Sequence, residues 1–102
     1  MNLSFVIPLY NEEKSLNELN SSILNVVNRM NINFEVIYVD DGSDDSSWKQ
    51  IKELSMKYNF VKGLRLSRNF GKSQALSAGF NVSEGKVVIT ICLLYTSDAA
   101  DE

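Results

Sequence analysis

Two polar segments of this sequence carry side chains suited to binding a nucleotide. In Pro8-Leu9-Tyr10-Asn11-Glu12, the Tyr10 ring can stack on a base and the Glu12 carboxylate can hydrogen-bond to it. In Asp40-Asp41-Gly42-Ser43, two adjacent carboxylates can accept hydrogen bonds from a base or a ribose hydroxyl. These side chains indicate nucleotide recognition when the fold brings the two segments together.

A third segment, Arg68-Asn69-Phe70-Gly71-Lys72, contains the cations Arg68 and Lys72, whose charge suits a diphosphate. Read alone, each of the three segments also fits an ordinary structural role. The first fits a strand end that leads into a loop, the second a turn with a helix cap, and the third two solvated cations beside a turn. Their order and their structural context must therefore decide the interpretation.

The residues around these segments alternate between strand and helix patterns. Short apolar runs predict strands, and apolar residues at helical spacing predict helices. The alternation predicts an α/β fold with a Rossmann-like parallel sheet. The predicted strands are 3–8, 34–39, 61–66 and 86–91, and the predicted helices are 16–30, 45–58 and 73–82.

Local signals predict how the helices begin and end. Ser15 and Glu18 have the spacing of a capping box for the first helix. Asp44 and Asp45 are expected in the first turn of the second helix, where the helix dipole favours acids. Gly85 is expected to end the third helix.

A parallel sheet places ligand contacts outside the carboxyl ends of its strands. The three polar segments follow the first three predicted strands, so we expect them at one edge of the sheet. Consecutive residues of a strand point to opposite faces, so one of Asp40 and Asp41 can face the ligand while the other turns to a loop or a helix. Gly42 provides the turn that follows.

Composition excludes several classes of function. The 102 residues suffice for one small core. A formal charge of −3 without a Lys/Arg run argues against nucleic acid as a partner. The absence of histidine excludes histidine chemistry, and the single cysteine, Cys92, cannot form an internal disulfide, as expected in a reducing cytoplasm. We find no signal peptide and no apolar run of spanning length.

Three other nucleotide or phosphate folds fit the motifs less well. Gly71-Lys72-Ser73 lacks the glycine that a P-loop needs five residues earlier, where Leu66 stands. A dinucleotide-binding motif would place glycines after the first strand, where this chain has Pro8 to Glu12. A receiver domain would carry its acidic pair after the first strand, whereas Asp40-Asp41 follows the second.

The three segments together resemble the family 2 glycosyltransferases with the GT-A fold. The resemblance covers 3–91 and includes Val39-Asp40-Asp41-Gly42-Ser43. The Arg68-Asn69-Phe70-Gly71-Lys72 segment is most similar to the branch with a polyprenyl-phosphate acceptor, that of the dolichol-phosphate mannosyltransferases and undecaprenyl-phosphate sugar transferases. The resemblance implies the N-terminal half of a GT-A domain, a UDP- or GDP-sugar donor, a polyprenyl-phosphate acceptor and a place in glycan biosynthesis at the cytoplasmic membrane face.

The resemblance also implies roles for individual residues. Pro8, Tyr10 and Glu12 match the loop that contacts the nucleotide. Val39 and Asp41 match the pair that holds the base, with Asp41 as its hydrogen-bond acceptor. By the same resemblance, Arg68 and Lys72 are candidates for contacting the pyrophosphate or the acceptor phosphate.

One departure from the family pattern concerns the metal. The strand that ends at Ile91 should lead into an Asp-x-Asp motif that binds Mg²⁺ or Mn²⁺, but Cys92-Leu93-Leu94 follows it here. We therefore assign no catalytic residue and no metal ligand, and we expect this chain not to catalyse transfer. The alternative function is a catalytically inert nucleotide-binding fragment.

The last eleven residues, 92–102, fit neither a helix nor a strand pattern. They resemble the in-frame translation of a transposase sequencing adapter, so we expect the native sequence to stop near Ile91. The expected units are thus 1–91, the truncated nucleotide-sugar-binding part, and 92–102, a non-native tail. A sheet without its later strands would have an unpaired edge, which predicts association and marginal stability.

Overall fold

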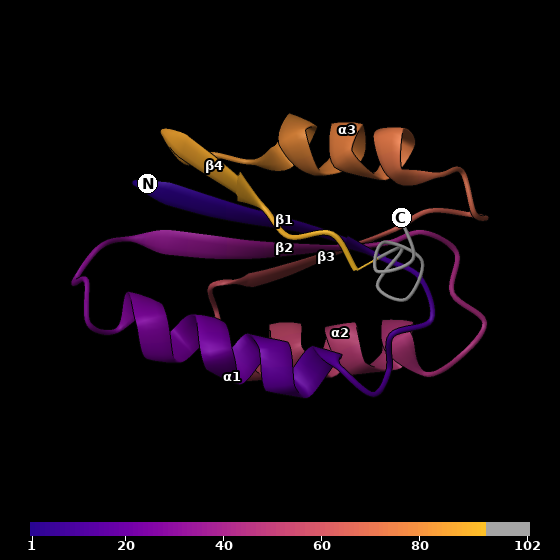
Figure 1. Ribbon diagram of the computed structural model, residues 1–102, viewed down its shortest axis with the longest axis horizontal. Helices are drawn as coiled ribbons and strands as arrows, with labels where there is room; N and C mark the ends of the chain where they lie inside the picture. Colours follow the sequence, from indigo (N-terminus) through magenta and orange to yellow (C-terminus); the bar gives the residue numbers. More distant parts are fainter. Residues whose placement is uncertain (94–102) are drawn as a thin grey trace, which may run out of the picture.

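The computed structural model describes residues 1–93 of the chain. Strands and helices alternate throughout, as the apolar pattern predicts (Figure 1). In chain order the elements are β1 (Leu3–Leu9), α1 (Leu16–Val27), β2 (Phe34–Asp40), α2 (Ser47–Lys57), β3 (Val61–Arg65), α3 (Lys72–Val82) and β4 (Val87–Thr90).

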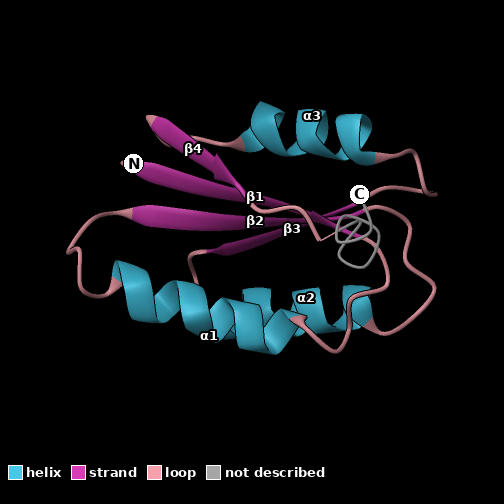
Figure 2. Ribbon diagram, in the orientation of Figure 1, coloured by secondary structure: helices cyan, strands magenta, loops and turns pink. Residues whose placement is uncertain are grey.

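The four strands form one parallel sheet in the order β3-β2-β1-β4. Helices α1 and α2 cover one face of the sheet and α3 covers the other (Figure 2). The chain therefore moves outward from β1 to β3 on one side, and then crosses to the opposite side of β1 to add β4. This reversal lies between β1 and β4, at the kind of position where open α/β sheets bind ligands.

The central strands β1 and β2 are buried on both faces, which explains why they are almost continuously apolar. The residues of β1 and β2 alternate between two clusters of apolar side chains. On the α1/α2 face the larger cluster includes Phe5, Ile7, Tyr38 and Ile51. On the α3 face a smaller cluster contains Val6, Ile37, Val39 and Ala75.

Close packing of α3 depends on a residue without a side chain. A Cβ atom on Gly79 would lie 2.4 Å from Val6 Cγ1 and 3.2 Å from Val39 Cγ2. The face of this helix that carries Ala75 and Gly79 is therefore the face that contacts the sheet.

The predicted capping box at the start of α1 is wrong. Ser15 makes no side-chain hydrogen bond to the helix, and its Oγ instead donates to Glu12 Oε1 at 3.2 Å. The backbone N–H of Ser15 also donates to the Glu12 carbonyl, so the preceding turn takes the side chain that was expected to cap the helix. At the other end α1 stops at Val27, and Met30 is exposed.

The predicted boundaries of the other two helices also need correction. Asp44 and Asp45 precede α2 instead of forming its first turn, because Asp45 uses its carboxylate to accept the N–H of Ser47. Helix α3 ends at Val82 without using Gly85. Gly85 is small for another reason: a Cβ atom there would lie 2.6 Å from the backbone nitrogen of Ser4.

Only the first two residues of the expected non-native tail, Cys92 and Leu93, belong to the described part of the chain, and the rest of 92–102 lies outside it. Leu93 continues beside β1, donating its N–H to the Pro8 carbonyl and bridging to Leu9. Within residues 1–93, no helix has the length and apolarity to cross a membrane.

Candidate nucleotide-binding site

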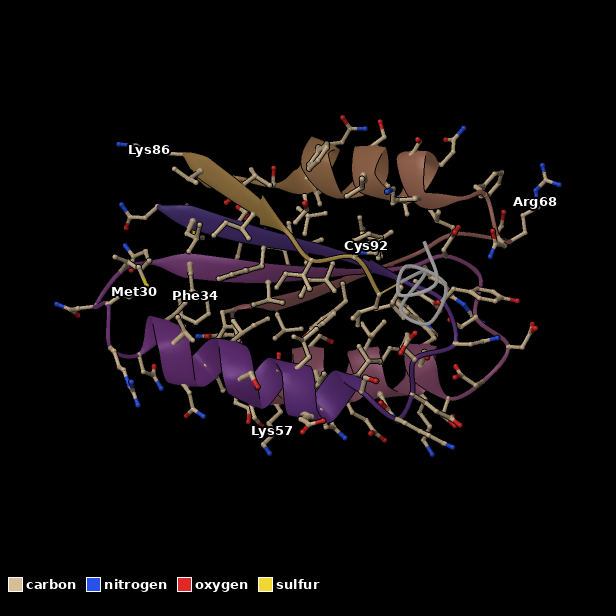
Figure 3. The ribbon with its side chains drawn as sticks, viewed as in Figure 1. Met30, Phe34, Lys57, Arg68, Lys86 and Cys92 are labelled. Atoms are coloured by element: carbon tan, nitrogen blue, oxygen red, sulfur yellow. The ribbon has the colours of Figure 1, made fainter. Side chains whose placement is uncertain are left out.

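Three loops meet at the carboxyl edge of the sheet, because β1, β2 and β3 run in the same direction. We call them the β1–α1 loop (10–15), the β2–α2 loop (41–46) and the β3–α3 loop (66–71). They contain most of the three polar segments that the sequence singles out, and the other residues of these segments lie in the adjoining ends of β1, β2 and α3. Figure 3 shows Arg68, from the β3–α3 loop, at the end of the molecule opposite Lys86 and Met30.

Asn11 joins the β1–α1 loop to the β2–α2 loop. Its side-chain oxygen Oδ1 accepts the N–H groups of Asp44 at 2.8 Å and Asp45 at 3.3 Å. Its own N–H donates to Ser43 Oγ at 2.8 Å. Asn11 has a φ of 52°, a left-handed conformation that asparagine tolerates better than most residues. The backbone shape at this position thus directs the amide toward the neighbouring loop.

Further hydrogen bonds extend this junction toward α2. Ser47 Oγ accepts the N–H of Glu12 at 2.9 Å, and Glu13 Oε1 accepts the N–H of Ser46 at 2.8 Å. Asp45 accepts the N–H of Ser47 at 2.8 Å and that of Glu13 at 3.3 Å. Burial alone would raise the pKa of Asp45, but these hydrogen bonds, led by those from Ser47, outweigh it and lower the pKa. The carboxylate is therefore ionised at neutral pH.

The adjacent acids Asp40 and Asp41 are both fully buried and point in different directions, as the strand pattern predicts. Asp40 Oδ1 accepts the N–H of Ser43 at 2.9 Å and so shapes its own loop. Its Oδ2 has no hydrogen-bond partner among the described residues, and the nearest cation is Arg65, with Nε 3.9 Å away. The Arg65 guanidinium also lies over the Trp48 ring, 5.7 Å from the centroid.

Asp41 turns to the β3–α3 loop. Its Oδ1 accepts the N–H of Phe70 at 2.8 Å, and its Oδ2 accepts the N–H of Gly71 at 3.0 Å. Gly42 brings the two loops into backbone contact, since a Cβ atom there would lie 2.4 Å from the carbonyl carbon of Arg68. The φ of Gly42 is +79°, which side chains disfavour. Both properties make glycine necessary at this turn.

A cavity of about 400 Å³ opens between these two loops. Its polar lining includes the guanidinium-bearing Arg65 at the end of β3 and hydroxyl groups from both loops. The lining residues are Gly42, Ser43, Asp44, Arg65, Leu66 and Ser67. A space of this size is in the range of small-molecule sites.

The structure brings most of the predicted site residues to the same edge of the sheet. Tyr10 and Glu12 lie in the β1–α1 loop, and the Tyr10 hydroxyl is 3.5 Å from Asp44 Oδ2. The cations Arg68 and Lys72 are exposed. The Arg68 guanidinium lies over the Phe70 ring, 4.7 Å from the centroid.

Pro8 and Val39 do not have side chains at the surface of this edge. They are paired on neighbouring strands and both are buried, with Val39 in the apolar cluster beneath α3. Sequence reasoning also missed two residues of the site, Asn11 and Arg65. Asn11 stands within a segment already singled out, but the alternation of strand and loop gives no signal that its amide spans two loops.

The described residues do not fit a divalent metal site. No group of three or more histidine, cysteine or acidic side chains converges within residues 1–93. The two buried acids nearest the cavity use at least one oxygen each on backbone N–H groups. Residues 1–93 therefore provide no set of ligands for a catalytic metal ion.

The sheet and its helices define an α/β fold with a polar loop edge, and comparison with known proteins identifies the family. The model of the family "Glycosyl transferase family 2" matches residues 4–92. The chain therefore belongs to glycosyltransferase family 2, and its parallel sheet is that of a GT-A-like domain.

Curated relatives show the same family. The chain is 40% identical over 91 residues to a dolichol-phosphate mannosyltransferase of Pyrococcus furiosus, covering 89% of this chain and 25% of that protein. It is 41% identical over 90 residues to an undecaprenyl-phosphate 4-deoxy-4-formamido-L-arabinose transferase of Proteus mirabilis, covering 87% and 28%. The chain thus spans about a quarter of the length of these relatives.

A solved structure shares the fold. Residues 1–349 of TarS from S. aureus, crystallised with UDP, superpose with a TM-score of 0.73 at 27% identity. The match covers 99% of this chain and 31% of the TarS chain.

Proposed function

We propose that this chain is the nucleotide-sugar-binding part of a glycosyltransferase that transfers a sugar from a UDP- or GDP-sugar to a polyprenyl phosphate. The main support is the meeting of three polar loops at the carboxyl edge of the sheet, where hydrogen bonds join them around a polar cavity. The names of two relatives specify polyprenyl-phosphate acceptors, and a structural relative was crystallised with UDP. The corresponding location is the cytoplasmic face of the membrane.

Individual residues have distinct parts in this proposal. Tyr10 supplies a ring for the base, and Glu12 lies beside it in the same loop. Arg68 and Lys72 contribute positive charge for the diphosphate, where a guanidinium can form two parallel hydrogen bonds. Pro8 and Val39, which are buried, shape the floor of the site through the backbone.

The chain as it stands is proposed to bind the nucleotide without transferring the sugar. The described residues lack the acidic cluster that would hold Mg²⁺ or Mn²⁺, the metals implied for the complete enzyme. An inert nucleotide-binding fragment, the alternative function, is therefore the expected behaviour of this polypeptide. Incubation with a radiolabelled UDP-sugar and a polyprenyl phosphate should yield no labelled lipid, and labelled lipid would contradict this part of the proposal.

Metal-free titration calorimetry with UDP and GDP tests the binding function. We expect saturable binding of at least one of them, weakened about tenfold by Arg68→Ala because a charge-assisted contact of about 1.4 kcal/mol is lost. Lys57→Ala is the matched control, since Lys57 ends α2 away from the loop edge and its ammonium lies over the Tyr58 ring. A folded chain that binds neither nucleotide would refute the proposal.

A further inference from the structure

Both carboxylate oxygens of Asp41 accept hydrogen bonds from within the protein. The residue is 0% exposed, and each of its two oxygens accepts one backbone N–H from the β3–α3 loop. A base could reach this carboxylate only if the loop moved away. In the observed arrangement, the direct contacts of Asp41 are therefore with Phe70 and Gly71.

These two amides lie immediately before α3. Gly71 is the N-cap residue of the helix, has a φ of +104° and, as a glycine, has no side chain that could cap the helix. Asp41 thus provides from 30 residues away the negative charge that a helix N-terminus favours. The positions of Arg68 and Lys72, which flank the two amides in sequence, depend on this contact.

Backbone packing at Gly42 also holds the β3–α3 loop in place. Gly42 follows Asp41 and lies in direct contact with the backbone of Arg68 and Asn69. The loop is therefore held at two points: by hydrogen bonds to the acid and by backbone contact at the glycine.

We infer that Asp41 is a positioning residue that fixes the β3–α3 loop, so that Arg68 and Lys72 face the diphosphate of the donor. This inference rests on the proposed nucleotide-sugar function and adds a role for Asp41 that differs from contact with the base. A contact with the base would affect only ligands that contain one. A positioning role affects every ligand that the loop cations bind, including inorganic pyrophosphate.

Amide hydrogen exchange followed by NMR tests the positioning directly in the full chain. In the unaltered protein, the Phe70 and Gly71 amides should exchange at least about tenfold more slowly than those of Arg68 and Asn69, which have no hydrogen bond to any of residues 1–93. Asp41→Asn should reduce this difference, because its Nδ2 group is a donor and cannot accept an N–H, which leaves one acceptor oxygen for the two amides. Equal exchange at all four amides of the unaltered chain would overturn the inference.

Ligand binding tests the consequence. Asp41→Asn should lower the affinities for UDP and for inorganic pyrophosphate by the same factor, about tenfold. Loss of a base contact would lower the affinity for UDP alone, and this result would overturn the inference. Glu53→Gln is the matched control, since Glu53 is exposed on α2, outside the three loops, and its replacement removes the same charge. Its affinities should stay within twofold of those of the unaltered chain.

A second variant covers the case in which Asp41→Asn does not fold. Gly42→Ala keeps the carboxylate and pushes the loop away, so it should also speed exchange at Phe70 and Gly71 and weaken both ligands. Unchanged exchange in this variant would count against the inference. If the unaltered chain binds neither UDP nor pyrophosphate, the proposed function fails, but the exchange experiment still decides whether Asp41 holds the loop.

Discussion

The Glu35 carboxylate on β2 and the Lys62 ammonium on β3 form an ion pair, with 2.7 Å between Oε1 and Nζ. The glutamate side chain is 1% exposed and the lysine side chain is 42% exposed. The other oxygen, Oε2, accepts the Ser4 hydroxyl and the N–H of Glu84 at 2.7 Å. One buried carboxylate therefore connects three strands and the segment that leads into β4, at the end of the sheet away from the loop edge.

This ion pair predicts a loss of stability in acid. Burial alone would raise the pKa of Glu35, but the hydrogen bonds from Lys62, Ser4 and the Glu84 backbone outweigh it and lower the pKa below 4.5. A lowered pKa in the folded state means that the stabilisation is present above pH 4.5 and is lost as the pH falls through the folded value. The Glu35 hydrogen bond raises the pKa of Lys62 above 10.5, so its contribution is lost only in strong base.

Urea unfolding of Glu35→Gln checks this prediction. At pH 7 the free energy of unfolding should fall by about 1–3 kcal/mol, since a charged acceptor is lost at a buried site. The difference from the unaltered chain should shrink as the pH falls below 4.5, because Glu35 is progressively protonated and becomes neutral like the glutamine. Glu53→Gln, at an exposed position on α2, is the control and should change little. A difference that is constant down to pH 2 would contradict the assignment.

A buried hydrogen bond between β2 and α1 leads to the second prediction. The Tyr38 hydroxyl donates to Asn20 Oδ1 at 2.8 Å, and both residues are buried. Tyr38→Phe should lower the free energy of unfolding by about 1–3 kcal/mol, because it leaves a buried amide oxygen without its donor. Tyr10→Phe removes a hydroxyl from a long, exposed contact and should have almost no effect. Equal losses in the two variants would argue against a special role for the buried pair.

The third prediction concerns the packing of α3 on the sheet. Gly79→Ala should destabilise the chain by about 1–3 kcal/mol, although alanine favours helices, because the added Cβ atom would overlap Val6. Ser77→Ala, on the exposed side of the same helix, should be neutral or slightly stabilising. Thermal unfolding of both variants measures the contrast. A stabilised Gly79→Ala chain would mean that the helix packs less closely than the structure shows.

The fourth prediction concerns the edge of the sheet. Among residues 1–93, strand β4 pairs with β1 only, and all four of its residues are exposed, including Val88 and Ile89. An exposed apolar edge favours pairing between chains, so we expect the protein to self-associate with marginal stability. Ile89→Lys should shift sedimentation toward the monomer, whereas Val26→Lys on α1 adds the same charge elsewhere and should not. A cooperative thermal transition of a monomeric unaltered chain would show this prediction to be wrong.

The alternation of apolar runs by itself determined the class of fold. Strand and helix periodicities are local properties, so seven elements and a parallel sheet follow from the sequence without knowledge of any distant contact. The same rule placed Tyr10, Asp41 and Arg68 at one edge, because the carboxyl ends of parallel strands share an edge. The opposite directions of Asp40 and Asp41 also followed from strand geometry.

Only the tertiary structure decided what these polar groups contact. Asp41 meets Phe70 across 29 residues, and Asn11 meets Ser43 across 32, so neither partner lies within the range of a helix or turn pattern. The capping box at Ser15 failed for a local reason, since the Ser15 hydroxyl donates to Glu12, three residues earlier, in the turn before α1. Sequence patterns report the periodicity of the backbone, whereas hydrogen bonds between loops depend on how closely the completed sheet brings the loops together.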